Sequence, residues 1–210
     1  HSPDPAAYAE VNRDGTGRLG AALSRHGCRR MLHLSTRALG AACGAYGESK
    51  REAERVLSTV GFESLLLLRP AEVYGAGREG IDAFLALARR WRIVPWLFGD
   101  RRIRFAPLHV SDFVRACVDL LLSPAPGVRT VELCGPEVLT GTGLAFRLAR
   151  QGVAPIPVFW PLVEPTLALL RAMGRAPGVP DQAARLLGAK SSERSSDGLP
   201  APVHRFPGPR

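Results

Sequence analysis

The chain has 210 residues, 46% of them hydrophobic and 7% aromatic, which suits one globular domain or one domain with a small lobe. The net charge of +9 comes mostly from scattered arginines, and no basic stripe interleaved with aromatic residues marks a nucleic-acid surface. No run of about 18 apolar residues predicts a membrane-spanning helix, and we expect a cytoplasmic protein with a small-molecule substrate and no nucleic-acid partner.

The first third of the chain predicts a helix, a strand and a second helix. Apolar residues recur at helical spacing from Asp4 to Arg25, and the short apolar segment Arg30–Ser35 predicts a strand that ends in hydroxyls. Residues 48–60 predict a helix, because Gly61 just beyond them is a natural C-cap. The glycines of "GTGRLG" (15–20) lie inside the first helix, so this segment is not interpreted as a phosphate-binding turn.

The rest of the chain continues this alternation. "SLLLLRP" (64–70) is apolar on both faces, as in a central parallel strand, and Pro70 ends it. The next expected elements are helices over 81–92, 110–123, 139–151 and 163–173 and a strand over 129–135. Ser111 is a plausible N-cap of the second helix in this series, and Thr140 or Thr142 of the third. The alternation predicts an α/β fold, a Rossmann-like doubly wound parallel sheet.

Tyr46 precedes Lys50 by four residues, so the phenol and the ammonium share one face of a helix. A nearby ammonium favours the phenolate and suits a tyrosine to proton transfer near neutral pH, although two such common residues also fall one turn apart by chance. Doubly wound sheets bind ligands beyond the carboxyl ends of their strands. One of these ends is Ser35–Thr36, just before the Tyr46 helix.

Cysteine usage argues against metal and disulfide chemistry. The four cysteines, Cys28, Cys43, Cys117 and Cys134, form no CxxC pair and have no histidine cluster near them. We therefore expect free thiols in a reducing compartment and no metal site.

Six segments, in this order, resemble the NAD(P)-dependent epimerase/dehydratase family, the extended and atypical short-chain dehydrogenases/reductases. They are "VNRDGTGRL" (11–19), "LHLST" (32–36), "YGESKREAE" (46–54), "LLRPAEVYG" (67–75), "PLHVSDFVRA" (107–116) and "ELCGPEVLT" (132–140). The resemblance implies NAD or NADP as cofactor and a sugar nucleotide or related hydroxy/keto compound as substrate of an oxidoreductase or epimerase. The alternative is a non-catalytic dinucleotide-binding or scaffold subunit, similar to the accessory subunit of respiratory complex I. A homodimer is also possible.

The resemblance assigns the catalytic roles to residues. Tyr46 would be the acid/base, and Lys50 would favour its phenolate and bind the nicotinamide ribose. Thr36 would hydrogen-bond the substrate oxygen, with Ser35 as a supporting cofactor contact at the strand end. Asn12 would help to order the site, although helix packing explains this residue equally well.

Further contacts follow from the later segments. Pro70, Ala71 and Val73 belong to the turn whose backbone would contact the nicotinamide carboxamide. Arg104 is a candidate ligand for a substrate phosphate, against the simpler interpretation of a solvated arginine. Asp112 matches a position that is mostly structural, and helix capping explains it without catalysis.

The resemblance also divides the chain. Residues 1–139 would form a partial NAD(P)-binding domain, with 76–107 contributing to the substrate lobe. Residues 140–189 would complete that C-terminal lobe. Residues 190–210, rich in Ser, Pro, Gly and Arg, predict a disordered tail.

The sequence departs from the family pattern in two ways. No GxxGxxG follows a first strand, so the pyrophosphate would lack its anion site and dinucleotide binding would be weakened. The chain is then either an N-terminally truncated fragment or a short protein that binds dinucleotide poorly, and the apolar sheet surface left exposed favours the fragment. Arg37 follows Thr36 where sugar-nucleotide dehydratases carry an acid, which disfavours dehydratase chemistry.

Overall fold

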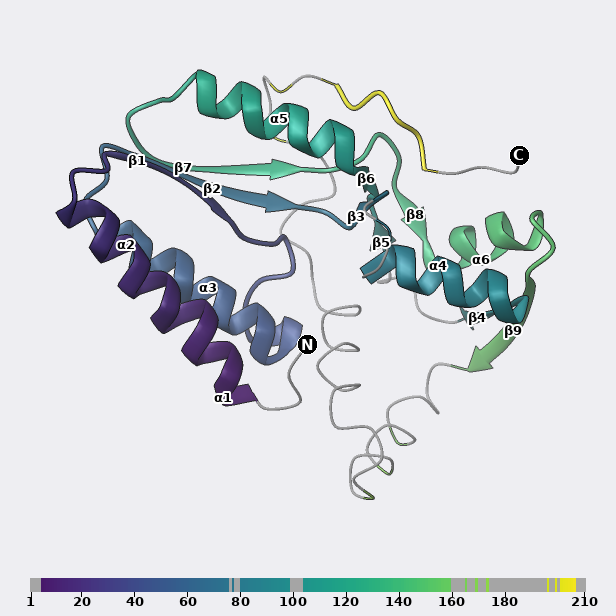
Figure 1. The fold of residues 1–210 in the computed structure, drawn as a ribbon. Helices are drawn as coiled ribbons and strands as arrows, with labels where there is room; N and C mark the ends of the chain where they lie inside the picture. The colour runs from purple at the N-terminus through teal and green to yellow at the C-terminus, as the bar shows by residue number, and fades with distance from the viewer. Residues whose placement is uncertain are drawn as a thin grey trace.

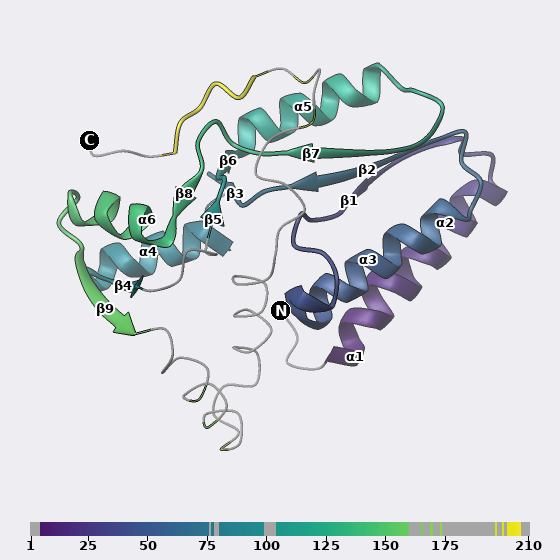
Figure 2. The ribbon, with the colours of Figure 1, turned by 180° about the vertical axis from the view of Figure 1, so that it is seen from behind.

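The computed structural model describes residues 5–75, 77, 80–98, 104–159 and 201–206, with single positions 165, 169, 173, 196 and 199. At its centre lies a parallel three-stranded sheet in the order β1 (Arg30–Leu34), β2 (Ser64–Pro70), β7 (Gly127–Leu133). Helices α2 (Thr16–Arg25) and α3 (Gly44–Ser58) cover one face and α5 (Val110–Leu122) the other, as Figures 1 and 2 show. The Rossmann-like α/β arrangement is as predicted.

Strand β2 is apolar on both sides because each side enters a different core. Leu65 and Leu67 pack with Leu57 of α3, whereas Leu66 and Leu68 pack with residues of α5 and β7. This explains the unbroken leucine run, since a central parallel strand is covered on both faces. Gly61, beyond the end of α3, has a φ of +86°, a conformation that favours glycine.

The first helical segment runs without a break through α1 (Pro5–Tyr8), a π-helical stretch η1 (Ala9–Gly15) and α2. Its glycines serve helix packing. A Cβ on Gly20 would lie 2.6 Å from Leu57 Cδ2, and one on Gly17 would lie 2.8 Å from Val56 Cγ1. The interpretation of "GTGRLG" as part of a helix is therefore confirmed.

A second region, called the lobe below, consists of α4 (Gly80–Trp91), β4 (Ile93–Phe98), α6 (Gly141–Ala149) and β9 (Ala154–Phe159). Strands β4 and β9 pair in parallel, and α4 and α6 bury an apolar core that includes Leu85, Val94 and Leu148. The side chain of Thr140 caps α6 by accepting from Gly143 N at 2.9 Å, so Thr140 rather than Thr142 is the cap.

Short strands join the two regions. β3 (Val73–Tyr74) pairs in parallel with β6 (Leu108–His109). β5 (Arg104–Phe105) pairs antiparallel with β8 (Leu139–Thr140). These pairs follow the carboxyl ends of β2 and β7, so the lobe lies beyond that end of the central sheet (Figure 1).

Residues 201–206, part of the predicted tail, contact both regions of the structure. Val203 N and His204 N donate to Asp112 Oδ2 at 3.1 and 2.9 Å, and Phe206, only 2% exposed, stacks edge-on against Tyr74 in the lobe core. A buried carboxylate and an aromatic side chain give this segment partners that its composition does not reveal. Most of the remaining tail, and most of the helix predicted over 163–173, fall outside the described residues.

The start of α5 also differs from the prediction. His109, not Ser111, is the N-cap, because its Nδ1 accepts from Ser111 N at 3.2 Å. Asp112 does not cap the helix but holds the 201–206 segment, as described above. Among the described residues no helix combines the length and hydropathy needed to cross a membrane.

Candidate functional site

The predicted pair Tyr46 and Lys50 lies at the carboxyl end of β1. Lys50 Nζ is 6.0 Å from the centroid of the Tyr46 ring and donates to Leu34 O, the last residue of β1, at 3.2 Å. The first turn of α3 packs tightly on the loop that follows Thr36, since a Cβ on Gly47 would lie 2.8 Å from Ala38 O. The helix and the strand end therefore meet as the sequence predicts.

Burial shapes the electrostatics below this pair. It lowers the pKa of the Lys50 ammonium, and Glu54 opposes the shift. Burial also lowers the pKa of His33 to about 4, and the neighbouring Lys50 adds to that effect. Glu54 in turn receives two bonds from Arg69, at 2.9 and 2.6 Å. An ammonium that is partly removed from water interacts more strongly with nearby groups than an exposed one.

Asn12 reaches the site through a serine that the sequence analysis did not single out. Asn12 Nδ2 donates to Ser49 Oγ at 3.0 Å, and Ser49 Oγ donates to the carbonyl of Tyr46 at 2.8 Å. The Tyr8 ring packs edge-on against Tyr46 with centroids 5.7 Å apart. Asn12 thus steadies the first turn of α3, which combines the ordering role with the helix-packing role. Ser49 follows Tyr46 by three residues, a spacing that places its hydroxyl near the Tyr46 carbonyl in a helix.

The two hydroxyls at the end of β1 have different environments. Thr36 is half-buried, and its Oγ1 accepts from Ala38 N at 3.1 Å. Ser35 donates its backbone N–H to Leu68 O at 2.7 Å, and its buried Oγ has no partner among the described residues. Ser35 therefore belongs to the sheet, whereas Thr36 faces the loop that leads to α3.

The turn after β2 carries the predicted carboxamide contacts. Ala71 is buried and its N–H donates to Leu133 O at 2.7 Å, whereas Pro70 and Val73 are half-buried. Glu72, between them, forms an ion pair with the buried Arg37 at 2.8 Å. The sequence analysis singled out Arg37, but not its pairing with Glu72.

Arg104 lies exposed on β5, beyond the ends of β1 and β2. Its carbonyl accepts from Arg37 Nη2 at 3.3 Å, so its backbone belongs to the same cluster as Thr36 and Glu72. The structure therefore brings the Arg104 backbone to the predicted site.

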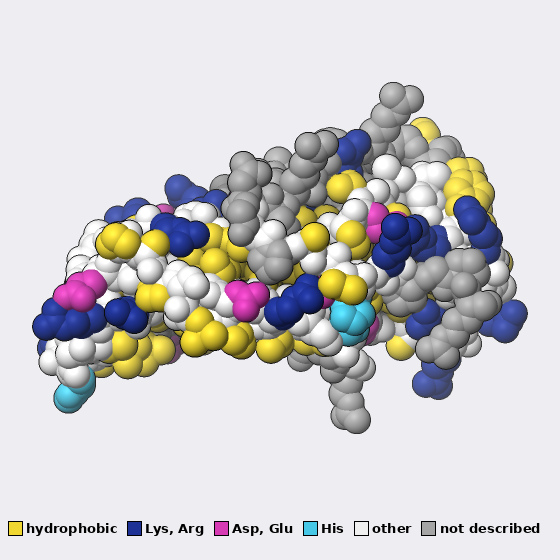
Figure 3. Space-filling model, turned by 90° about the horizontal axis from the view of Figure 1, so that it is seen from above, with side chains coloured by type: hydrophobic (Ala, Val, Ile, Leu, Met, Phe, Trp, Pro, Cys, Tyr) yellow, Lys and Arg dark blue, Asp and Glu magenta, His cyan; other side chains and the backbone are white. Residues whose placement is uncertain are grey.

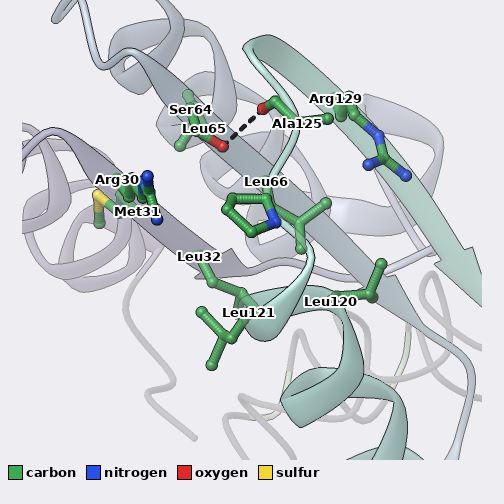
Figure 4. Close-up of a pocket in the computed structure, with 11 residues that line it drawn as sticks. Arg30, Met31, Leu32, Ser64, Leu65, Leu66, Leu120, Leu121, Ala125 and Arg129 are labelled. Atoms are coloured by element: carbon green, nitrogen blue, oxygen red, sulfur yellow. Dashed lines mark hydrogen bonds between the residues drawn. The ribbon is translucent and has the colours of Figure 1, made fainter.

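A cavity at the opposite end of the sheet is not part of this site. It encloses about 40 Å³ and is lined by leucines of β1, β2 and the last turn of α5 (Figure 4). Ser64 and Ala125, joined by a 2.7 Å hydrogen bond, lie at its rim near the amino ends of the strands. Small-molecule sites typically enclose about 300–1,000 Å³, so this cavity is a gap beside α5.

The outer face of α5 carries scattered charges rather than a basic patch (Figure 3). Exposed apolar side chains interrupt the charges there: Val114, Val118, Leu121 and Leu122. All four cysteines are free thiols. Within the part of the chain that the structure describes, no group of three His, Cys, Asp or Glu side chains could hold a metal ion.

The parallel sheet, with a Tyr/Lys helix that starts near a strand end carrying hydroxyls, is a doubly wound α/β arrangement, in which ligands bind beyond the carboxyl ends of the strands. The sequence model of the NAD dependent epimerase/dehydratase family matches residues 1–134. The chain therefore belongs to this family. No curated protein sequence matches it significantly.

Similar solved structures include three nucleotide-sugar proteins. MoeE5 in complex with UDP-glucuronic acid and NAD is 23% identical, with a TM-score of 0.58 over 70% of this chain and 56% of that one. DesIV, a dTDP-glucose 4,6-dehydratase from Streptomyces venezuelae with NAD and TYD bound, is 21% identical. Its TM-score is 0.62 over 74% of this chain and 55% of that one. UDP-glucose 4-epimerase from Thermotoga maritima with UDP-glucose is 22% identical, with a TM-score of 0.59 over 74% of this chain and 58% of that one. These likenesses show the fold, and this chain spans just over half the length of each neighbour.

Proposed function

We propose that this chain carries the catalytic residues of an NAD(P)-dependent oxidoreductase or epimerase acting on a sugar nucleotide or a related hydroxy/keto compound. The observation that carries the proposal is the position of Lys50, close to the Tyr46 ring and bonded to Leu34 O immediately before Ser35 and Thr36. The neighbours that bind NAD together with a sugar nucleotide, such as MoeE5, support the substrate class.

Each side chain has a role in handling the alkoxide that hydride transfer makes or consumes. Tyr46 exchanges the proton with that oxygen, and the Lys50 ammonium favours the phenolate. Thr36 already accepts a bond from Ala38 N, which orients its hydroxyl and keeps its proton for donation to the substrate oxygen. A bound nicotinamide supplies the hydride acceptor or donor.

The residues fit the nicotinamide end of NAD(P) better than its pyrophosphate. Lys50 would bind the ribose, with Pro70 and Val73 at the carboxamide. The sequence, however, offers no glycine turn at a helix N-terminus for the pyrophosphate, and β1 is an edge strand within the described part of the chain. The dinucleotide therefore binds weakly to this chain alone.

Calorimetric titration of the chain with NAD and NADP tests the cofactor. We expect dissociation constants well above the low-micromolar range for both, because the anion site is missing. Low-micromolar binding of either dinucleotide would contradict this expectation.

Single-turnover formation of NADH with saturating NAD and a panel of UDP- and dTDP-hexoses tests the chemistry. We expect Tyr46→Phe to slow the reaction by about 10²–10⁴-fold while sparing cofactor binding. Lys50→Ala should impair both the reaction rate and cofactor binding. Thr36→Val should raise the activation barrier by only about 0.5–1.5 kcal/mol. Tyr8→Phe, which removes the hydroxyl from the ring that packs against Tyr46, is the matched control and should retain the rate. A wild-type chain that turns over nothing in this panel would instead support the scaffold function.

A further inference from the structure

Three ionisable side chains lie in a row along α3. Tyr46, Lys50 and Glu54 follow one another at intervals of four residues, so each lies about one helical turn beyond the last. The row begins at the candidate acid/base and ends at a carboxylate with only 7% of its side chain exposed. The proposed function gives this buried carboxylate no role.

Glu54 is held in place by the central strand of the sheet. Arg69 of β2 donates through Nε and Nη2 to the two carboxylate oxygens of Glu54, at 2.9 and 2.6 Å. Such a bidentate contact fixes the orientation of the carboxylate. Arg69 Nη1 also donates to Glu132 of β7, at the longer distance of 3.5 Å. Ionised groups of alternating sign thus extend from Lys50 on α3 to β7.

The Lys50 ammonium lies where its charge is disfavoured. Lys50 is half-buried and donates to Leu34 O, and His33 of the same strand is buried. Burial lowers the pKa of the ammonium, and the Glu54 carboxylate opposes that change. His33 is uncharged near neutral pH, because burial and the neighbouring Lys50 lower its pKa to about 4. Among the described residues, Glu54 is therefore the carboxylate whose charge acts on Lys50.

A second carboxylate of α3 belongs to a separate group of charges. Arg13 and Asp14 of η1 pair with each other and lie with Glu52 along the groove between η1, α2 and α3. Glu52 also pairs with Arg55 at 3.0 Å. Glu52 and Glu54 are thus two carboxylates on one helix with different surroundings.

We propose that Glu54 is a positioning residue that keeps the Lys50 ammonium charged beside the Tyr46 ring. This proposal rests on the proposed function, in which that ammonium favours the phenolate, and it names the group on which the charge depends. Because Glu54 is buried and bound by Arg69, it acts through Lys50 rather than on a substrate. Without the Glu54 charge, burial alone would act, and the ammonium would lose its proton at lower pH.

The titration of Lys50 can be measured directly, because the chain contains only two lysines, Lys50 and Lys190. Isotope-labelled lysine gives two side-chain signals in NMR spectra, and Lys50→Arg identifies the Lys50 signal by removing it. The signal is followed from about pH 7 to about pH 11, which spans the usual range of lysine. We expect Glu54→Gln to move the Lys50 midpoint about one pH unit lower, since it removes the opposing charge and keeps the volume.

Two further variants separate the charge from the fold. Glu52→Gln is the matched control, because it makes the same change on the same helix but removes a partner of Arg55. The Lys50 midpoint should stay where it is in the wild type. Glu54→Asp keeps the charge on a shorter side chain and should restore most of the difference.

A double variant provides the same test if Glu54→Gln does not fold. Glu54→Leu combined with Arg69→Met removes both members of the ion pair, and apolar residues of similar size often replace such a pair without loss of stability. The Lys50 midpoint should fall in this variant as well, because the burial remains and the carboxylate is gone.

The outcomes that overturn the proposal are distinct. An unchanged Lys50 midpoint in folded Glu54→Gln or in the double variant would do so, as would an equal shift in Glu52→Gln. A chain whose Lys50 responds as expected but which turns over no substrate contradicts the proposed function alone. Turnover by a wild type whose Lys50 midpoint is insensitive to Glu54→Gln contradicts only the role of Glu54.

Discussion

The sheet region and the lobe bury very different side chains. The lobe core that the structure describes is built of aliphatic residues with a few aromatics, whereas the sheet region, with its flanking helices and strand-end turns, buries polar and charged groups. These are His33, Ser35, Arg37, Ser49, Glu54 and Asp112. Burying such groups costs free energy of folding unless each is paired, a cost that the apolar lobe core largely avoids.

The polar groups are concentrated where the candidate site lies. Ser35 and Arg37 flank Thr36, and Ser49 lies on the same helix turns as Tyr46 and Lys50. Perturbed and buried polar groups cluster at functional sites, because chemistry needs fixed polar geometry that packing alone does not supply. The contrast with the lobe therefore supports the carboxyl end of β1 as the functional part of this chain.

The largest expected effect comes from a close backbone approach in the sheet region. A Cβ on Gly135 would lie 1.6 Å from Pro107 O, so Gly135→Ala must displace backbone and should cost about 5 kcal/mol or more. Gly143→Ala in α6 is the control, because its Cβ would meet only Thr140 Oγ1 at 3.3 Å, and it should change stability by no more than about 1 kcal/mol. Urea unfolding measures both, and equal losses would show that the two regions tolerate bulk alike.

Charge removal should separate the regions next. Glu54 is 7% exposed in its bond to Arg69, whose other charge partner, Glu132, is more distant at 3.5 Å. Glu54→Gln removes the closer partner and should cost about 3 kcal/mol. Glu137, paired with Arg147 in the lobe, is 29% exposed, and Glu137→Gln should cost at most about 1 kcal/mol. A larger loss for Glu137→Gln in urea unfolding would reverse the comparison.

Acid should weaken the sheet region first. The pKa of His33 falls from 6.5 to about 4 because of burial and the neighbouring Lys50, so between these values the unfolded chain binds a proton that the folded chain does not. Stability present above pH 6.5 is therefore lost as the pH falls to 4, by about 3 kcal/mol. His33→Leu should flatten urea-unfolding midpoints across this window, and an unchanged pH slope would contradict the assignment.

The smallest expected effect concerns residues 201–206, which contact both the sheet region and the lobe. Burial opposes ionisation of the Asp112 carboxyl, but hydrogen bonds from His204 and Val203 outweigh burial and lower its pKa. The stability that the ionised Asp112 contributes is therefore lost in stronger acid than the stability that the neutral His33 contributes. Asp112→Asn should cost about 1–2 kcal/mol and speed hydrogen exchange at the Val203 and His204 amides. Asp119→Asn, on the exposed side of α5, should leave that exchange unchanged.

Local patterns in the sequence were enough to place the main elements. The apolar run before Pro70, the helix ending before Gly61 and the i,i+4 spacing of Tyr46 and Lys50 are all short-range signals, and each is confirmed in position. The family resemblance is also confirmed by the match to residues 1–134. The catalytic roles assigned to these residues stay predictions.

Long-range pairing was not visible in the sequence. Arg37 and Glu72 are 35 residues apart, and nothing near either residue shows that they meet. The contacts of the 201–206 segment, the buried Phe206 and the bonds of Val203 and His204 to Asp112, were likewise not visible in its composition. Such contacts depend on tertiary packing, which local propensity does not encode.

The attachment of Phe206 has a consequence for biosynthesis. Its partners Tyr74 and Arg147, and the Asp112 that anchors Val203 and His204, all precede it in the chain. A ribosome adding about 5–20 residues per second releases the sheet region and most of the lobe before residues 201–206. On the nascent chain the lobe core is thus incomplete and the Asp112 carboxylate still hydrated. The Phe206 side chain can complete the lobe core only after residue 206 has been synthesised.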